Sequence, residues 1–556
     1  MTIDFNKRDP ILGQIAFALA PEAQLDGALA WLIRDASSPD PVLVVLSKES
    51  LTDTLYVIAK GVMRRDLVEN PELPARRVVK IFRDRHVVIE DAGESRTAYI
   101  HNTVGNPSKH IGPELLRRAS LGRTVVLHGI GEVRVAFEPT LHTPGRFTHP
   151  ALDAMWPIDF ADPTFLTDPY PALEALRESA AVLHDERLQR WLVTRHADVR
   201  ACLRDRRLGR NFRHVGSEKE FAAEPLDARW SAFWDVERWS LLWLEPPEHT
   251  RIRKLVAAAF TPRSVEALRA PARALADELL APLVARGHME LLSDFAQPYS
   301  IRLICHLLGV PLGHERELLE WSHRMVKMYE LHVSDADAAA ANEASRAFRA
   351  FVVALLEERR RVPEDDLLTR LATASVDNEL LTDAEIVSTI VVLLNAGHEA
   401  TVNTLGNGLL ALIRHPGEWA RLCDGSVSPA SAVEEMLRWD PPLQLFERWV
   451  LEDGFEVSGV PIPRGSRIAL LFGAANRDPC VFADPDRFDV GRVNAGEHIG
   501  FGGGIHSCIG APLARIELEA ALGAIVARAP ELTLAEAPRR TGSFVIWGLE
   551  ALRLRL

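Results

Sequence analysis

One segment near the C-terminal end of the chain, residues 501–523, restricts the possible fold more than any other. It reads Phe501-GGGIHSCIGAPLARIELEAAL-Gly523 and places three consecutive glycines, then Cys508, just before a predicted helix with Pro512 in its first turn. The glycines let the backbone come close to a flat, bulky group, and the free N–H groups and positive dipole of a helix start favour a thiolate. The segment therefore predicts a cysteine that acts as an axial metal ligand.

The same segment resembles the haem-ligand loop of the cytochrome P450 family, which has the pattern F-G-x-G-x-H-x-C-x-G followed by L-A-R-x-E. The resemblance implies that Cys508 is the proximal thiolate of haem b and that Phe501, Gly502 and Gly510 belong to the cofactor-binding loop. It implies a mainly α cytochrome P450 fold with small β-sheets from Asp159 to the C-terminus. Thiolate donation in that family favours cleavage of the O–O bond.

Composition and charge exclude several other classes. The formal net charge of −13 argues against nucleic acid or an anionic membrane surface as a partner. The five cysteines form no C-x-x-C pair, which excludes a disulfide framework, a zinc ribbon and a closely spaced iron–sulfur motif. Neither a signal peptide nor an apolar run long enough for a membrane anchor is apparent. We therefore expect a soluble, cytoplasmic protein without a membrane anchor.

The first 150 residues differ from the rest in their predicted secondary structure. Their pattern predicts a small α/β N-terminal domain of unknown function. Strand-like runs at 41–47, 77–83 and 123–138 alternate with helical stretches around 22–35, 50–63 and 112–119. Prolines and glycine are frequent between residues 139 and 157, as in a linker. We expect a boundary there, with residues 1–150 as one domain and 151–556 as the haem domain.

From about residue 158 the sequence is mostly helical. Long amphipathic stretches are expected at 263–285, 311–331, 336–361, 383–413 and 429–438, with a strand-rich patch at 448–471. The stretch from 383 starts with a T-x-x-E capping box, is apolar on nearly all sides and stops before Pro416. Such a helix is predicted to run through the centre of a large domain.

Four side chains are expected to bind the haem propionates. The segment 244–260 resembles the D-P-P-x-H-T-R-L-R helix start of the family, with Glu245 in place of the usual aspartate. His249 and Arg253 lie at i and i+4 on one helix face, as two donors to one anion should. The resemblance adds Arg448 and His506 as the other two donors.

A structural ion network is predicted beside the haem loop. Glu435 and Arg438 stand at i and i+3 on one helix. The resemblance implies that this pair is buried and locked to an arginine in the segment that precedes the haem loop, for which Arg487 is the candidate.

Residues 396–401, AGHEAT, lie in the middle of the apolar helix and resemble the family pattern A-G-x-E/D-T. In that pattern the acid and the alcohol deliver protons for the activation of dioxygen. Glu399 matches the acid, but Ala400 stands at the alcohol position. Thr401 follows one residue later, rotated by about 100°, and can serve only if the helix bulges locally. Glu399 and Thr401 are the candidate catalytic residues.

The substrate pocket is predicted less sharply. Tryptophans are frequent between residues 230 and 243, a region that roofs the pocket in the family, although such clusters more often pack in a core. The candidate pocket residues are Trp239, Asn395, Ala396 and Phe446.

The sequence thus predicts a haem-thiolate monooxygenase that inserts one oxygen atom from O2 into a small organic substrate. Residues 1–150 contain neither cysteine nor G-x-G-x-x-G, so a separate ferredoxin and ferredoxin reductase are expected to supply electrons. The alternatives are a haem-thiolate sensor or binding protein, and a peroxide-driven or isomerising haem enzyme with an altered proton relay. The substrate and the oligomeric state stay open.

Overall fold

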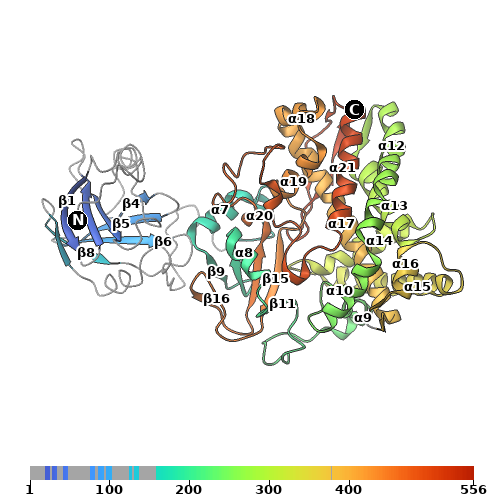
Figure 1. Cartoon of the computed structure of the whole chain (residues 1–556), viewed down its shortest axis with the longest axis horizontal. Helices are drawn as coiled ribbons and strands as arrows, with labels where there is room; N and C mark the ends of the chain where they lie inside the picture. The colour runs from blue at the N-terminus through green and yellow to red at the C-terminus, as the bar shows by residue number, and fades with distance from the viewer. Residues whose placement is uncertain are drawn as a thin grey trace. The chain divides into compact units, whose positions relative to one another are not determined.

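The computed structural model describes residues 158–556 except Asp377, and it describes eight strands between residues 19 and 136 by their backbone alone (Figure 1). The chain divides into two compact units, and each is described by itself. The first unit contains the eight strands, and the second contains most of residues 158–556. The domain boundary expected near residue 150 stays a prediction.

The strands of the first unit form two sheets. Three antiparallel strands have the order β1-β2-β3, and five have the order β4-β5-β6-β8-β7, with β6 and β8 parallel. Their bounds are β1 Leu19–Leu25, β2 Ala28–Ile33, β3 Val42–Ser47, β4 Arg76–Ile81, β5 Arg85–Ala92, β6 Ser95–Asn102, β7 Thr124–Leu127 and β8 Gly131–Ala136. The strand-like runs of the sequence thus coincide with β3, β4, β7 and β8.

The helix expected around residues 22–35 is wrong, because β1 and β2 occupy that stretch. Leu25 pairs with Ala28, so only Asp26 and Gly27 join the two strands. An Asp-Gly pair between two strands is a strong hairpin signal, and it outweighs the helical propensity of the surrounding alanines and leucines. The helices expected around 50–63 and 112–119 lie outside the described residues.

The second unit is mainly helical, as predicted. The five expected long helical stretches are confirmed, although the first is interrupted between α11 and α12 and the second ends in a short 3₁₀ turn at 327–329. The helices are α6 Pro163–Thr167, α7 Tyr170–Ser179, α8 His196–Cys202, α9 Ser231–Glu237, α10 Glu248–Ala259, α11 Pro262–Glu266, α12 Arg269–Arg286, α13 Gln297–Leu308, α14 Glu315–Val326, α15 Asp335–Arg361, α16 Leu367–Thr373, α17 Asp383–Arg414, α18 Pro416–Cys423, α19 Pro429–Trp439, α20 Phe472–Ala475 and α21 Ala511–Arg528.

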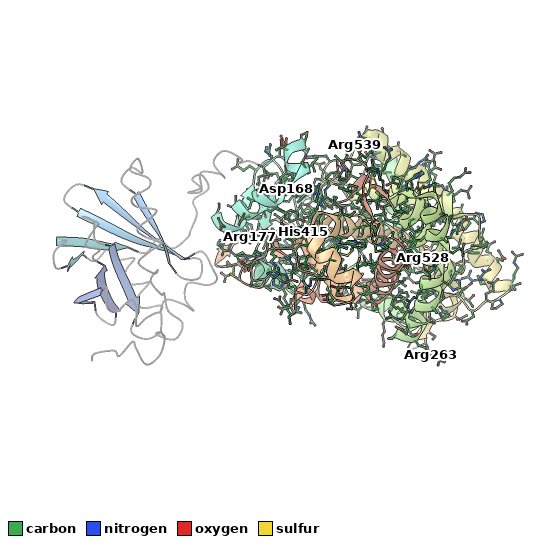
Figure 2. All side chains as sticks on the ribbon, turned by 90° about the horizontal axis from the view of Figure 1, so that it is seen from above. Asp168, Arg177, Arg263, His415, Arg528 and Arg539 are labelled. Atoms are coloured by element: carbon green, nitrogen blue, oxygen red, sulfur yellow. The ribbon has the colours of Figure 1, made fainter. Side chains whose placement is uncertain are left out.

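Helix α17 runs through the middle of this unit and packs against α13, α14, α15, α19 and α21 (Figure 1). Its start is the predicted capping box: the Thr382 hydroxyl accepts from the Glu385 N–H, and the Glu385 carboxylate accepts from the Thr382 N–H. Its end is closed by His415, labelled in Figure 2, whose Nδ1 lies 2.7 Å from the Ala411 carbonyl oxygen. Most residues between these caps are buried, as the apolar sequence predicts.

The main sheet of this unit has the order β11-β15-β18-β10-β9. All its strand pairs are antiparallel except β10 with β18, in which Trp191 is level with Ile468. Its strands are β9 Val182–Asp185, β10 Arg190–Val193, β11 Leu208–Gly209, β15 Leu445–Val450 and β18 Arg467–Leu471. The other short strands are β12 His288–Glu290, β13 Ser375–Val376, β14 Glu379–Leu380, β16 Glu456–Val457, β17 Val460–Pro461, β19 Thr533–Leu534, β20 Arg539–Arg540, β21 Leu549–Ala551 and β22 Arg553–Arg555. Within the described residues, no helix has the length and apolar character needed to span a bilayer.

Candidate active site

Cys508 lies in a tight loop that leads into α21. Its N–H donates to the carbonyl oxygen of Phe501 at 2.9 Å. Two of the three predicted glycines, Gly502 and Gly504, have a φ of 66°, a left-handed conformation that favours glycine. A Cβ atom on Gly504 would also lie 2.1 Å from the carbonyl oxygen of Leu203. The loop therefore needs glycine at both positions for its backbone path, and at Gly504 for its packing as well.

The exposure and the pKa of Cys508 together indicate that its thiol faces an internal space. Its side chain is exposed, yet burial raises the pKa of the thiol, a combination that fits an interior hollow and not the outer surface. The N–H groups of Gly510 and Ala511 and the charges of Arg253 and Arg515 act in the opposite direction. The helix start thus favours the thiolate as predicted, but burial outweighs it, and coordination to a metal cation is what deprotonates such a thiol.

Two buried side chains near this loop have polar atoms without a partner in the described structure. They are Nε2 of His249 on α10 and Nη2 of Arg448 on β15. Burial, followed by the charges of His506 and Arg253, lowers the pKa of His249 to about 4, and burial lowers the pKa of Arg448 to about 9. An unpaired buried donor costs about 1–3 kcal/mol, so both atoms fit a site for an anionic group such as a haem propionate.

The other two predicted propionate donors lie nearby but are engaged by the protein. The rings of His506 and His249 lie 4.5 Å apart between centroids. Nε2 of His506 is 3.1 Å from Oε1 of Glu245, the residue that replaces the usual aspartate. Burial alone would raise the pKa of Glu245, but its hydrogen bond with His506 and the nearby positive charges lower it overall. Nη2 of Arg253 donates to the carbonyl oxygen of Ser507 at 2.7 Å.

The predicted ion network is present, but its third member is Arg492 and not Arg487. Glu435 and Arg438 are both fully buried and form two hydrogen bonds of 2.6 and 2.8 Å. Nε of Arg492, a largely buried residue, lies 3.3 Å from the Glu435 carboxylate. The side chain of Arg487 is 62% exposed and faces Asp489, and only its backbone carbonyl accepts from Arg438. The turn at 484–487 directs that side chain outward, which spacing alone does not reveal.

A cavity of about 900 Å³ lies beside α17. Asn395 and Ala396 of α17 and Phe446 of β15 line it, as do Glu399 and Ala400. Three of the four pocket residues expected from the sequence are therefore found at one cavity.

The fourth expected pocket residue, Trp239, does not line this cavity and packs against the hydrophobic core instead. Trp234 and Trp243 line the cavity in its place. The frequency of tryptophan in 230–243 does not show which of them face the pocket, and α9 ends at Glu237, before Trp239.

Glu399 lies at the edge of this cavity. Burial raises the pKa of its carboxyl group to about 7, with Lys327 acting in the opposite direction. Its Oε1 has no hydrogen bond of good geometry, although Nε2 of His323 on α14 lies only 3.3 Å away. Glu399 can therefore hold or release a proton near neutral pH, and the half-exposed His323 connects it with solvent.

Thr401 lies on a different side of α17 from Glu399. It hydrogen-bonds the side chain of Glu517 on α21, and burial raises the pKa of that carboxyl group to about 8. The helix is regular from residue 383 to 414, so the local bulge that Thr401 would need is absent from the described α17. Ala400, which carries no hydroxyl group, faces the cavity.

Sequence reasoning also missed a buried pair in the cavity wall. The Tyr329 hydroxyl donates to Oε2 of Glu237 at 3.0 Å, and both residues line the cavity. Burial raises the pKa of Glu237 to about 7. The one available sequence signal was an acidic residue within the aromatic stretch 230–243.

Comparison with known proteins agrees with this geometry. A sequence profile of the cytochrome P450 family matches residues 240–423 and 430–529. Vitamin D(3) 25-hydroxylase of Pseudonocardia autotrophica is 38% identical over 68% of this chain and 90% of its own length. The 6-deoxyerythronolide B hydroxylase of Saccharopolyspora erythraea is also 38% identical, over 68% of this chain and 92% of its length.

A solved structure shows the same fold. The cytochrome P450 of the bacillaene polyketide synthase of Bacillus subtilis 168 has 33% sequence identity and a TM-score of 0.65, and the match covers 72% of this chain and 99% of that one. The loop at Cys508, the buried Glu435–Arg438 pair and the central helix lie within the matched profile. The chain therefore belongs to the cytochrome P450 family, binds haem b and is a haem-thiolate monooxygenase.

Proposed function

We propose that the chain inserts one oxygen atom from O2 into a small organic molecule that is mostly apolar and as large as a sterol or a macrolactone, with Cys508 as the ligand to the haem iron. The observation that carries the proposal is the exposed thiol of Cys508 on an internal space, at the start of α21. Haem held by a thiolate supplies the activation of dioxygen. The protein residues supply binding, orientation and protons.

In this proposal, His249 and Arg448 bind the haem propionates through their unpartnered Nε2 and Nη2 atoms. Arg253 and His506 are the second pair of donors, and each must exchange its present partner, the Ser507 carbonyl or Glu245, to reach a propionate. Phe501, Gly502 and Gly510 shape the loop around the ligand, and Phe501 also stacks on Arg515 at 4.6 Å. The Glu435–Arg438–Arg492 network holds the preceding segment in place.

Glu399 is proposed to deliver protons to the cavity. Its carboxyl group is poised near pH 7, lies on the cavity wall and is 3.3 Å from the solvent-reaching His323. No hydroxyl group stands at the neighbouring position, because Ala400 occupies it and Thr401 contacts Glu517. The chain therefore relies on the acid, with water in place of the alcohol.

The size and lining of the cavity support a substrate as large as a sterol or a macrolactone. About 900 Å³ exceeds what a compact monocyclic compound fills, and Trp234, Trp243 and Phe446 offer apolar surface. The Glu237–Tyr329 pair adds one polar contact for orientation. The named relatives that hydroxylate vitamin D(3) and 6-deoxyerythronolide B agree with this size class.

Electrons are proposed to come from a separate ferredoxin and ferredoxin reductase, which use NAD(P)H in the cytoplasm. Membership of the family and the lack of cysteine and of G-x-G-x-x-G in residues 1–150 support this arrangement. The alanine at position 400 favours one second candidate, peroxide-driven oxidation, because a relay without the alcohol can lose coupling between electron use and product.

A substrate screen followed by a coupling assay tests the proposal. Vitamin D3 and macrolactones should shift the haem spin state, and a binder should stimulate NAD(P)H consumption with a surrogate ferredoxin and reductase and yield a product one oxygen atom heavier. Product formed only with added hydrogen peroxide would favour the second candidate. Binding without any turnover in either assay would favour a sensor and contradict both.

A further inference from the structure

A group of metal-ligating side chains lies between α14 and α17, at the edge of the cavity. It consists of His323, His398 and Glu399, and one ligand atom from each lies within 4.8 Å of the others. Nε2 of His323 is 3.3 Å from Oε1 of Glu399, and the two imidazole rings lie 5.8 Å apart between centroids. Three side chains from two packed helices thus converge on one point.

His398 provides a second and independent observation. Its side chain is fully buried, yet neither Nδ1 nor Nε2 has a hydrogen-bond partner in the described structure. A neutral imidazole carries one donor and one acceptor, and leaving them unpaired in the interior costs about 1–3 kcal/mol per group. Oε1 of Glu399 is also without a hydrogen bond. The cluster therefore offers lone pairs that the protein itself does not satisfy.

We propose that His323, His398 and Glu399 form a binding site for a divalent transition-metal ion, with Zn²⁺ as the best match. Two imidazoles and one carboxylate are a common set of protein ligands for zinc, with the fourth position left to water. Tetrahedral zinc with bonds of about 2.0–2.1 Å needs ligand atoms about 3.3 Å apart. The ligand atoms of the cluster lie within 4.8 Å of one another, so a small movement of one side chain brings them to this spacing.

The side chain of His323 meets this requirement. It is 43% exposed, so it can change rotamer without disturbing the core and gives the ion a path from solvent. His398 and Glu399 are held by the central helix and provide the fixed half of the site. Lys327 is the positive charge that acts on both His323 and Glu399, and its exposed side chain can turn outward.

Metal binding would also take the Glu399 carboxylate away from the cavity. This consequence rests on the proposed proton delivery by Glu399, whereas the binding itself does not. A zinc ion would then act as a reversible inhibitor of turnover that leaves the haem ligand Cys508 untouched.

The test is a titration of the holoenzyme, without an added histidine tag, with Zn²⁺ in a calorimeter, together with metal analysis after dialysis. We expect one Zn²⁺ per chain with a Kd of about 1 μM or tighter, and X-ray absorption at the zinc edge should show imidazole ligands. His323→Gln should weaken binding at least about tenfold. The matched control is His314→Gln, because His314 also lies 3.3 Å from a glutamate, Glu317, but this pair is exposed and is not part of the cluster.

No stoichiometric binding, or equal affinity in the native chain and His323→Gln, would overturn the site. His398→Gln removes the buried ligand and should also weaken Zn²⁺ binding. If this variant does not fold, His323→Gln still tests the site, because it changes a half-exposed side chain. Binding with the expected His323 dependence but without any effect of Zn²⁺ on turnover would leave the metal site intact and contradict proton delivery by Glu399.

Discussion

The loop around Cys508 and the middle of α17 differ in how closely they follow the sequence pattern of the family. In the loop, the backbone and the side chains follow the family pattern at every position, and the glycine at 504 leaves no room for another residue. In α17, the segment 395–401 departs from the pattern and contains buried polar atoms without partners on Asn395, His398 and Glu399. The comparison teaches that one fixed cofactor restricts the first region, whereas the second adapts to a substrate and to a proton supply.

Replacement of Cys508, the proposed iron ligand in the loop, should abolish turnover completely. Cys508→Ala should abolish NAD(P)H-driven turnover, because Cys508 is the one cysteine within the loop sequence 501–510. Turnover with a surrogate ferredoxin and reductase is the measurement. Cys423→Ala, at an exposed cysteine, is the control and should behave like the native protein. Residual substrate oxidation by Cys508→Ala would contradict the claim that the cofactor restricts the loop to one ligand.

The helix should lose function in part. Glu399→Gln should slow turnover by about 10²-fold, the scale of a lost acid–base group, while haem binding stays unchanged. The pKa of Glu399 is about 7, so native turnover should fall as pH rises above about 7 and the acid loses its proton. The variant should lack this decline. Steady-state rates between pH 6 and 9 measure both effects, and an unaltered pH profile in Glu399→Gln would point to another proton donor.

Glu517 joins the two regions, since it lies on α21 behind the loop and contacts Thr401 of α17. Burial raises the pKa of Glu517 to about 8 from an ordinary value of 4.5 in the unfolded chain. The folded protein thus binds more protons than the unfolded chain between these values, and its free energy of unfolding falls as pH rises through that window, by at most about 1.4 kcal/mol per pH unit. Glu517→Gln should flatten the fall, as measured by thermal unfolding from pH 5 to 8.5. An equally steep fall in the variant would assign the effect to other buried acids such as Glu237.

Two neighbouring substitutions on α17 should have small and unequal consequences for coupling. Ala400→Thr places a hydroxyl group at the cavity and should raise product formed per NAD(P)H by a few-fold at most. Thr401→Val removes a group that contacts Glu517 and should leave coupling unchanged. Hydrogen peroxide release and product yield measure both. Loss of coupling in Thr401→Val would mean that α17 bulges during turnover.

Removal of the first 150 residues should have the smallest effect on the haem site. The haem-associated residues named above all lie at or beyond Glu245. A chain that begins at Ala151 should bind haem with the same absorption spectrum as the full chain. A haem-free or insoluble product would mean that the first 150 residues contribute to the core of the haem domain.

The sequence predicted the positions that a cofactor restricts. Cys508 and the glycine loop could be recognised because backbone conformation and ligand chemistry both leave one solution there, and α17 could be recognised from its capping box and apolar length. Arg438 was found as well, since its partner Glu435 is one helical turn away.

Other predictions depend on the direction in which a side chain points, and the spacing of residues in the sequence does not reveal that direction. Arg487 and Arg492 both precede the loop, and only the turn between them decides which side chain reaches Glu435. Trp239 packs against the core and does not line the cavity, because α9 ends two residues before it. The meeting of His323 with His398 needs the packing of α14 on α17, which no local pattern in the sequence reveals.

The absorption spectrum of the reduced, CO-bound protein tests the central claim most directly, because the position of the Soret band reports the ligand on the other side of the haem iron. The native chain should show the strongly red-shifted band of a thiolate ligand, and Cys508→Ala should lack it. A native band at the position typical of histidine-ligated haem, or a red-shifted band that persists in Cys508→Ala, would contradict Cys508 as the iron ligand.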